Sequence, residues 1–328
     1  MWVPLLAVIA GFIALVWSAD RFLSGAASTA SHLGVSKLLI GLTVVSLGTS
    51  TPEILVSLMA AIEGNPLLAV GNAIGSNIAN IGLVLGLTAM VAPLPFSQGV
   101  LRTELPWLLG ATLLTLILLF DLQLSTTDGV LLLGGLGLIL YRLKQHYGVG
   151  ADTTADPIAD ALQEELEELP ELSRAKAAAW LLAGLLVLLI SAELLVWGAV
   201  EIAAWLGVSE LIIGLTIVAV GTSLPELAAT LGAALKGQAD IAIGNVVGSN
   251  ILNMLAVLAV PALVSAPDVG IEVLWRDFGM MLALTVALAL FAYAIGSRPV
   301  ITRFEGAVIL LGWIGYNAVL FQQVPIAR

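Results

Sequence analysis

Long apolar runs separated by short polar stretches recur along the whole chain. Runs of about 20 apolar residues are typical of helices that span a bilayer. The pattern predicts ten such spans, five in each half of the chain: 3–23, 36–62, 66–92, 103–121 and 127–144, then 177–197, 209–235, 239–265, 274–295 and 304–322. These expectations define an all-α polytopic membrane protein.

Composition agrees with a membrane environment, since 59% of the residues are hydrophobic and 11% are charged. The first apolar run begins at Trp2 without a basic leader or a small-residue cleavage site, so we interpret it as a spanning helix and not a signal peptide. The sequence has no cysteine, which excludes disulfides and thiolate metal sites. The net charge of -11 argues against a nucleic-acid partner.

Residues 148–173 form the only long polar stretch of the sequence. The stretch is acidic and separates residues 1–147 from residues 174–328. We interpret it as a solvated linker with a short helix near 161–169. A calcium-sensing loop is the alternative, but the carboxylates lack the D-x-[DN]-x-[DN]-G spacing of such loops.

The two halves repeat each other. GVSKLLIGLTVVSLGTSTPEI, from Gly34, returns as GVSELIIGLTIVAVGTSLPEL from Gly207, and AVGNAIGSNIANIGLVLG, from Ala69, returns as AIGNVVGSNILNMLAVLA from Ala242. Both pairs keep an offset of 173 positions, which indicates an internal duplication. Five spans per repeat make the two copies enter the membrane from opposite sides, so the sequence predicts an inverted-topology pair of five-helix repeats.

The basic residues test this topology. Nine of them fall on one side of the ten predicted spans: Lys37, Arg102, Arg142, Lys144, Arg174, Lys176, Lys236, Arg298 and Arg303. Arg276 and Arg328 fall on the other side. By the positive-inside rule, both termini face outside and the acidic linker is cytoplasmic.

A helix breaker and a carboxylate lie in the middle of the second span. Pro52 lacks an N–H donor and, with Gly48, weakens the helix directly before Glu53. Broken helices are tolerated where the freed backbone faces a cavity, and an unpaired carboxylate costs about 2.5–3.5 kcal/mol at the centre of a span, so a cation must compensate. The repeats bring both breaks to the midplane, and the oxygen donors around them are Ser46, Thr49, Ser50 and Glu53 in one copy and Ala219, Thr222, Ser223 and Glu226 in the other.

The second repeated motif adds hydroxyls and amides. Helical spacing places Ser76 and Asn80 on one face, and Ser249 and Asn253 repeat this arrangement. Asn72, Asn77, Asn245 and Asn250 lie nearby. Small residues and amides at such spacing also serve simple helix packing, through Gly71 and Gly75 and their copies Gly244 and Gly248.

This inventory suits a hard cation. Calcium takes about six to eight oxygens from carboxylates, carbonyls and hydroxyls, and the donors above include neither His nor Cys. His32 and His146 lie near predicted span ends, where solvated or capping roles are expected.

The paired GTS-x-PE and GN-xx-GSN-xx-N motifs resemble the alpha repeats of the cation/calcium exchanger superfamily, particularly the prokaryotic sodium/calcium exchangers. The resemblance implies an antiporter of the inner (plasma) membrane that transports Ca²⁺ and Na⁺ and carries no prosthetic group. It implies that Glu53 and Glu226 bind both ions, that Thr49, Ser50, Thr222 and Ser223 line them, and that Ser76 and Ser249 complete flanking sodium sites. Backbone oxygens of Ser46 and Ala219 would contribute. The first and sixth spans would form a sliding gate.

One position departs from part of the family. The residue that matches Asn253 is an Asp in potassium-dependent exchangers, whereas Asn80 and Asn253 are both amides here. Potassium dependence is therefore in doubt, and H⁺/Ca²⁺ exchange stays open because two buried glutamates are able to carry protons.

Other classes of protein fit less well. A calcium channel would need a continuous path, which inverted repeats with broken helices do not predict. An enzyme would need a nucleophile elbow, a histidine pair or a phosphate loop beside the glutamates, and the sequence has none of these. The sequence leaves the oligomeric state open, and a monomer is sufficient for transport.

Overall fold

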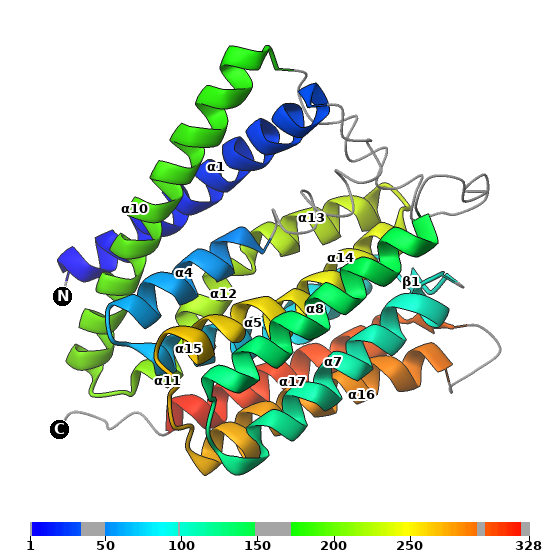
Figure 1. Cartoon of the computed structure of the whole chain (residues 1–328). Coiled ribbons are helices and arrows are strands. Elements are labelled where there is room, and N and C mark those ends of the chain that lie inside the picture. The colour runs from blue at the N-terminus through cyan, green and yellow to red at the C-terminus, as the bar shows by residue number, and fades with distance from the viewer. Residues whose placement is uncertain (1, 34–49, 98, 148–171, 294–298, 323–328) are drawn as a thin grey trace.

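The computed structural model describes residues 2–33, 50–97, 99–147, 172–293 and 299–322, and these are mostly helical (Figure 1). Ser46, Thr49 and most of the acidic linker lie outside the described residues. Predictions that concern them are therefore not tested by the structure.

The first repeat begins with a long helix and continues with shorter segments interrupted by π-helical turns. Its elements are α1 (Trp2–His32), α4 (Thr51–Ile62), α5 (Pro66–Ala79), the π-helix η2 (Asn80–Leu85), α6 (Gly86–Val91), β1 (Leu94–Pro95), the π-helix η3 (Val100–Glu104), α7 (Leu105–Leu118), the 3₁₀-helix η4 (Leu119–Asp121) and α8 (Thr126–Tyr147).

The second repeat has the same order of long and broken helices. Its elements are α10 (Arg174–Leu206), α11 (Glu210–Ile213), the π-helix η5 (Gly214–Val218), α12 (Ala219–Thr222), α13 (Leu224–Leu235), α14 (Ala239–Leu252), the π-helix η6 (Asn253–Val257), α15 (Ala259–Val264), the π-helix η7 (Val273–Phe278), α16 (Gly279–Tyr293), β2 (Val300–Ile301) and α17 (Arg303–Gln322).

Among the described residues, seven helices are long and apolar enough to cross a membrane, and each coincides with a predicted span. An eighth span forms if the bent pair Glu210–Thr222 and Leu224–Leu235, which turns by 43°, is counted as one. This bend is the predicted break of span 209–235. Of the other two predicted spans, 36–62 is described only from residue 50, and 127–144 coincides with α8, which is not among the seven.

α1 and α10 are longer than the spans predicted at 3–23 and 177–197. The predicted span ends at residue 23, but small residues continue the helix to His32, and Ser24, Gly25 and Ala27 among them are buried. α10 begins after Ser173, whose side chain accepts from the Lys176 N–H, and ends at Gly207, whose φ of +67° favours glycine. Helices of 31 and 33 residues exceed the bilayer core and must tilt or extend beyond it.

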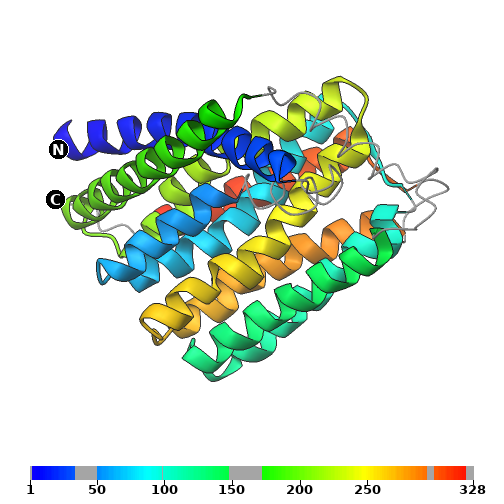
Figure 2. The ribbon, with the colours of Figure 1, turned by 45° about the horizontal axis from the view of Figure 1, so that its top comes forward.

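α1 and α10 pack against each other in antiparallel fashion and slant across the other helices (Figures 1 and 2). Gly11 meets Leu195, and Gly184, its copy, meets Phe22, the copy of Leu195. Gly25 meets Ala177 and Leu181, whereas Gly198 meets Pro4 and Val8, which are the copies of those two residues. The contacts are therefore reciprocal, as they are in a two-fold pair.

Short bridges also join the two repeats at the ends of the bundle. β1 pairs antiparallel with β2 through Leu94 and Ile301, and an isolated bridge joins Gln123 to Asp268, which is the copy of Pro95. The π-helices η2 and η6 also begin 173 positions apart, and so do η3 and η7. Short extended segments therefore join the two repeats at two places.

The middle of the molecule is formed by the continuous helices Pro66–Val91 and Ala239–Val264, the most buried of the candidate spans. Gly71 faces the Leu211 carbonyl and Gly214, and Gly75 faces Leu215 and Ala219. This confirms the expected close approach for these two glycines. The nearest neighbour of Gly244 is Glu104, and Gly248 has no neighbour within 4 Å among the described residues.

We predict that Gly25→Ala destabilises the protein, because its Cβ would lie 2.4 Å from the Leu181 backbone nitrogen. Overpacking of this kind costs about 1–3 kcal/mol, so thermal unfolding in detergent should begin several degrees lower. Gly110→Ala is the matched control, since its Cβ would meet no described atom within 4 Å. Equal unfolding temperatures for the two variants would contradict the close packing of α1 on α10.

Candidate cation-binding site

Glu53 and Glu226 occupy equivalent positions at the starts of two helices. Ser50 and Ser223 are the N-cap residues of α4 and α13, Pro52 and Pro225 lie in the first turn, and each glutamate is the third helical residue. Proline is favoured there because the first N–H groups of a helix have no intrahelical acceptor. The positive end of the helix dipole stabilises a carboxylate at the same place.

All of the predicted site residues that the structure describes are buried. Glu53, Ser50, Ser76, Asn80, Ala219, Thr222, Glu226 and Asn253 have 0% exposure, and Ser223 and Ser249 have 1% and 2%. The structure therefore places the predicted donors of both repeats inside the protein and not on its lipid-facing surface.

One hydrogen-bond network surrounds Glu226. The Ser249 hydroxyl donates to Glu226 Oε1 at 3.4 Å and lies 3.3 Å from the Ser50 hydroxyl. Asn80 Nδ2 donates to the Ser249 hydroxyl at 3.2 Å and to Asn250 Oδ1 at 3.0 Å. This network joins α4 and η2 of the first repeat to α13 and α14 of the second.

A second network lies beside Glu53. Asn72 Nδ2 donates to the Glu53 backbone carbonyl at 3.2 Å and to the Ser57 hydroxyl at 3.0 Å. The Thr222 hydroxyl donates to Asn72 Oδ1 at 3.3 Å and lies 3.4 Å from the Ser76 hydroxyl. Elements of both repeats therefore meet here as well.

The order of the motifs along each repeat predicts hydroxyl pairs within a repeat, Ser50 with Ser76 and Ser223 with Ser249. Within the described ranges, the hydroxyl pairs at hydrogen-bond distance instead run between repeats, from Ser50 to Ser249 and from Ser76 to Thr222. The reason is that each half-helix packs across the repeat boundary, which no spacing within one repeat reveals.

Two supporting residues were missed from the sequence. Ser57 accepts from Asn72, and Thr230, its copy, accepts from Asn245 Nδ2 at the same 3.0 Å. Both follow a site glutamate by four residues and therefore share its helix face. The combination of this spacing with the 173-residue offset would have identified them.

Several buried oxygens of the site have no hydrogen-bond partner in the described part of the chain. These are Oε1 and Oε2 of Glu53, Oε2 of Glu226, Oγ of Ser223, and Oδ1 of Asn77, Asn80 and Asn253. A buried acceptor without a donor costs about 1–3 kcal/mol, and more when it is charged. A cation bound among these oxygens would remove that cost.

The Ala219 carbonyl was expected to be free for a cation. It accepts the Ser223 N–H at 3.1 Å and the Thr222 hydroxyl at 3.3 Å. A carbonyl has two lone pairs, so coordination by Ala219 would require the Thr222 hydroxyl to turn away.

The donor set consists of carboxylates, hydroxyls and amides. No group of three or more His, Cys, Asp or Glu side chains lies together among the residues that the structure describes, so carboxylates alone do not form the site. Such mixed oxygen sets suit Ca²⁺ and Na⁺ and disfavour transition metals.

Glu63 follows the far end of α4, outside the site. Burial and the charge of Glu193 on α10 raise the pKa of Glu63. Two carboxylates of different elements therefore lie near each other beyond α4. The copy of Glu63 is Lys236, so this end differs in charge from its counterpart.

Comparison with known proteins identifies the family. The family model described as "Sodium/calcium exchanger protein" matches residues 3–144 and 176–322. CaxA of Alkalimonas amylolytica is 45% identical over 98% of this chain and 99% of its own length. The Escherichia coli protein named inner membrane protein YrbG is 38% identical over 97% of both chains.

The solved structures give the same answer. A structure of the sodium-calcium exchanger NCX_Mj is 32% identical, covers 96% of this chain and 98% of its own, and superposes with a TM-score of 0.64. The helical fold and the membrane spans agree with this match. The chain is a membrane protein and belongs to the sodium/calcium exchanger family.

Proposed function

We propose that the chain is a secondary antiporter that exchanges Ca²⁺ for Na⁺ and binds both ions between Glu53 and Glu226. The observation that carries this proposal is the set of buried oxygens that have no hydrogen-bond donor among the described residues. Three of the four carboxylate oxygens of Glu53 and Glu226 belong to this set. Membership of the exchanger family supports the choice of ions. The protein is accordingly a transporter and not an enzyme.

Each site residue has a role in this proposal. Glu53 and Glu226 are the shared charged ligands, with Ser50, Thr222 and Ser223 beside them and Ser76 and Ser249 completing sodium sites at the flanks. Asn80 and Asn253 add amide oxygens, and Ala219 adds a carbonyl. The remaining members, Ser46 and Thr49, are proposed by analogy with their copies Ala219 and Thr222, since both lie outside the described residues.

The proposed architecture is a pair of inverted five-helix repeats, residues 1–147 and 174–328, joined by the linker 148–173. The reciprocal glycine contacts between α1 and α10 support it, because antiparallel copies related by a two-fold axis make such contacts. We further propose that both termini face outside, that the linker is cytoplasmic and that the protein lies in a prokaryotic inner membrane.

Charge makes the two ions compete. A cavity with two formal negative charges is neutralised by one Ca²⁺ or by monovalent ions, whereas both sets together would leave excess positive charge in a medium of low dielectric. Exchange follows if the site changes the side of the membrane to which it is open only while it holds Ca²⁺ or Na⁺. Proton exchange uses the same two carboxylates and is the alternative function.

We predict that Glu53→Gln and Glu226→Gln fold and insert but lose calcium exchange. Each substitution removes a buried charge, so insertion is not impaired, whereas the loss of a charged ligand worth about 3 kcal/mol lowers transport by at least about 100-fold. ⁴⁵Ca²⁺ uptake into proteoliposomes measures this. Glu63→Gln is the matched control, because Glu63 follows the same helix outside the site. Normal uptake by either site variant would exclude that residue as a ligand.

We predict that an imposed Na⁺ gradient drives Ca²⁺ uptake and that a pH gradient without Na⁺ does not. A desolvated Na⁺ needs several oxygens in place of water, and the hydroxyl pairs Ser50–Ser249 and Ser76–Thr222 supply them, whereas a proton needs only a carboxylate. Ser76→Ala should therefore weaken Na⁺ dependence more than Ca²⁺ binding. Ser191→Ala is the control, since this buried serine bonds within α10. Uptake that follows only the pH gradient would establish proton exchange instead.

A further inference from the structure

Cations and indole rings alternate along one end of the α1–α10 pair. The Arg21 guanidinium carbon lies 5.2 Å from the centre of the Trp17 ring and 4.9 Å from that of Trp180. Lys176 Nζ lies 5.0 Å from the Trp180 ring. These four residues, which we call the cation–indole ladder, tie α1 to α10 through contacts of the cation–π type.

The ladder is absent from the other end of the pair, although the backbone packing is reciprocal. The copies of Trp17, Arg21, Lys176 and Trp180 are Ile190, Leu194, Val3 and Ala7, all apolar. Packing of α1 on α10 therefore does not require the ladder residues, since the opposite end packs without them. Their charge and aromaticity must serve something that is present at one end only.

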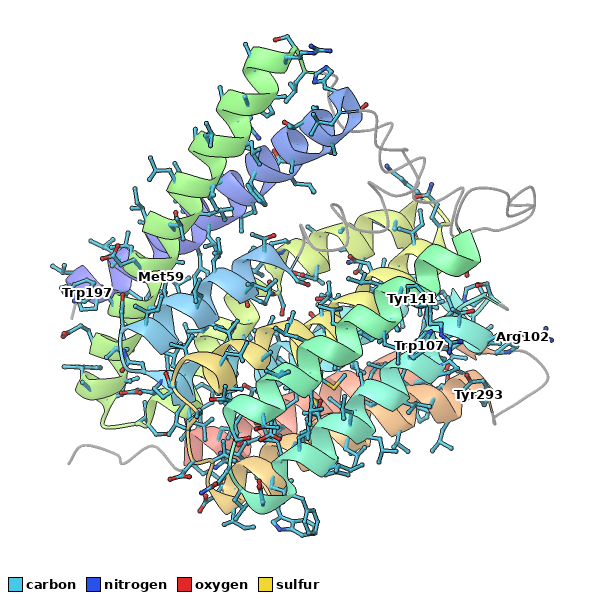
Figure 3. The ribbon with its side chains drawn as sticks, viewed as in Figure 1. Met59, Arg102, Trp107, Tyr141, Trp197 and Tyr293 are labelled. Atoms are coloured by element: carbon cyan, nitrogen blue, oxygen red, sulfur yellow. The ribbon has the colours of Figure 1, made fainter. Side chains whose placement is uncertain are left out.

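The position of the ladder matches a membrane interface. Arg21 follows Trp2 by 19 residues of continuous helix, or about 28 Å, which is close to the thickness of the hydrocarbon core. Trp2 is 71% exposed, and Trp197 lies at the same end of the molecule as the start of α1 (Figure 3). Tryptophans thus mark both ends of the pair, as they do at the two faces of a bilayer.

The charge at the ladder is positive overall. Arg21, Lys176 and the exposed Arg174 contribute three positive charges, and Asp20, which forms an ion pair with Arg21, contributes one negative charge. Arginine presents five N–H donors, and the bond to Asp20 engages Nη1. Apolar side chains that face outward adjoin the ladder on both helices, including Ile13 and Leu182, each 67% exposed.

We propose that the cation–indole ladder binds the phosphate of an anionic phospholipid. The planar guanidinium of Arg21 and the ammonium of Lys176 suit a phosphate group, and the rings of Trp17 and Trp180 suit the headgroup level of a bilayer. The acyl chains would lie along the exposed apolar residues of α1 and α10. Basic positions between helices on the cytoplasmic face are where such headgroups bind.

Binding at this place has a structural consequence. The phosphate bridges a residue of α1 to a residue of α10, so the lipid holds one end of the pair together and fixes it at the interface. The opposite end, with apolar copies at the same positions, receives no such tie. The proposal does not rest on the ions that are transported.

Lipid binding to the purified full chain tests the proposal. Native mass spectrometry during titration with phosphatidylglycerol or phosphatidylcholine gives the affinity for each. We expect a preference for phosphatidylglycerol that falls about tenfold in the double variant Arg21→Gln/Lys176→Gln, since each basic residue near a membrane surface contributes measurably to anionic-lipid binding. Arg102→Gln/Arg303→Gln, which removes two exposed arginines elsewhere, should keep the preference. Equal affinities in the two double variants would overturn the proposal.

Folding of the variants is checked by size exclusion and thermal unfolding. If Arg21→Gln/Lys176→Gln does not fold, Lys176→Gln alone and Arg21→Lys replace it, because each keeps more of the cation–indole contacts. Both should bind phosphatidylglycerol more weakly than the parent chain. Unchanged affinity in both would overturn the proposal.

Two further measurements distinguish a bound lipid from two other occupants of the ladder, a free anion and the acidic linker. Inorganic phosphate at millimolar concentration should not displace phosphatidylglycerol, and displacement would show a site for free anions. Neutralising the linker carboxylates Glu164, Glu165, Glu167 and Glu168 to glutamine should leave the affinity unchanged. A marked gain in phosphatidylglycerol affinity would show that the acidic linker occupies the ladder in the parent chain and would overturn the assignment to lipid.

Discussion

The rest of the structure depends on one constraint, which is that two buried carboxylates, those of Glu53 and Glu226, must be stabilised inside the protein. Glu53 and Glu226 have no exposed surface, and three of their four carboxylate oxygens have no donor within the described residues. Isolated charges of this kind are stable only beside positive charge. The helix breaks supply part of it through the N-terminal dipoles of α4 and α13, and in the function that we propose a bound cation supplies the rest.

The repeats are symmetric in packing and asymmetric in charge. Glycine contacts between α1 and α10 recur at the copied positions. By contrast, Arg21 corresponds to Leu194, and Glu63 corresponds to Lys236. Packing must be similar in both copies because each buries the same surface against the other. In the inverted architecture that we propose, charge is free to differ, because the two ends of the pair meet different sides of the membrane.

The sequence predicted the membrane spans more fully than it predicted the contacts between them. Apolar periodicity located the spans, and the 173-residue offset predicted that Glu53 and Glu226 lie at equivalent breaks that face each other. Neither signal alone predicts the π-helical turns or the pairing of Ser50 with Ser249. That pairing depends on how half-helices cross the repeat boundary. The sequence underestimated the length of α1, because the strongly apolar stretch ends near Asp20 whereas the helix continues to His32.

Matching π-helical turns connect the packed scaffold to the unsatisfied site. Asn80 and Asn253 are the first residues of η2 and η6, and π-helical turns occur often at functional sites. Yet Asn80 donates to Ser249 and Asn250, whereas neither amide atom of Asn253 has a partner in the described residues. The amide nitrogen is thus satisfied in one copy and unsatisfied in the other, whereas the amide oxygen has no described partner in either copy. A backbone with the same π-helical turn in both copies therefore holds different sets of hydrogen bonds, and in the function that we propose the unpaired oxygens are the ones left to bind a cation.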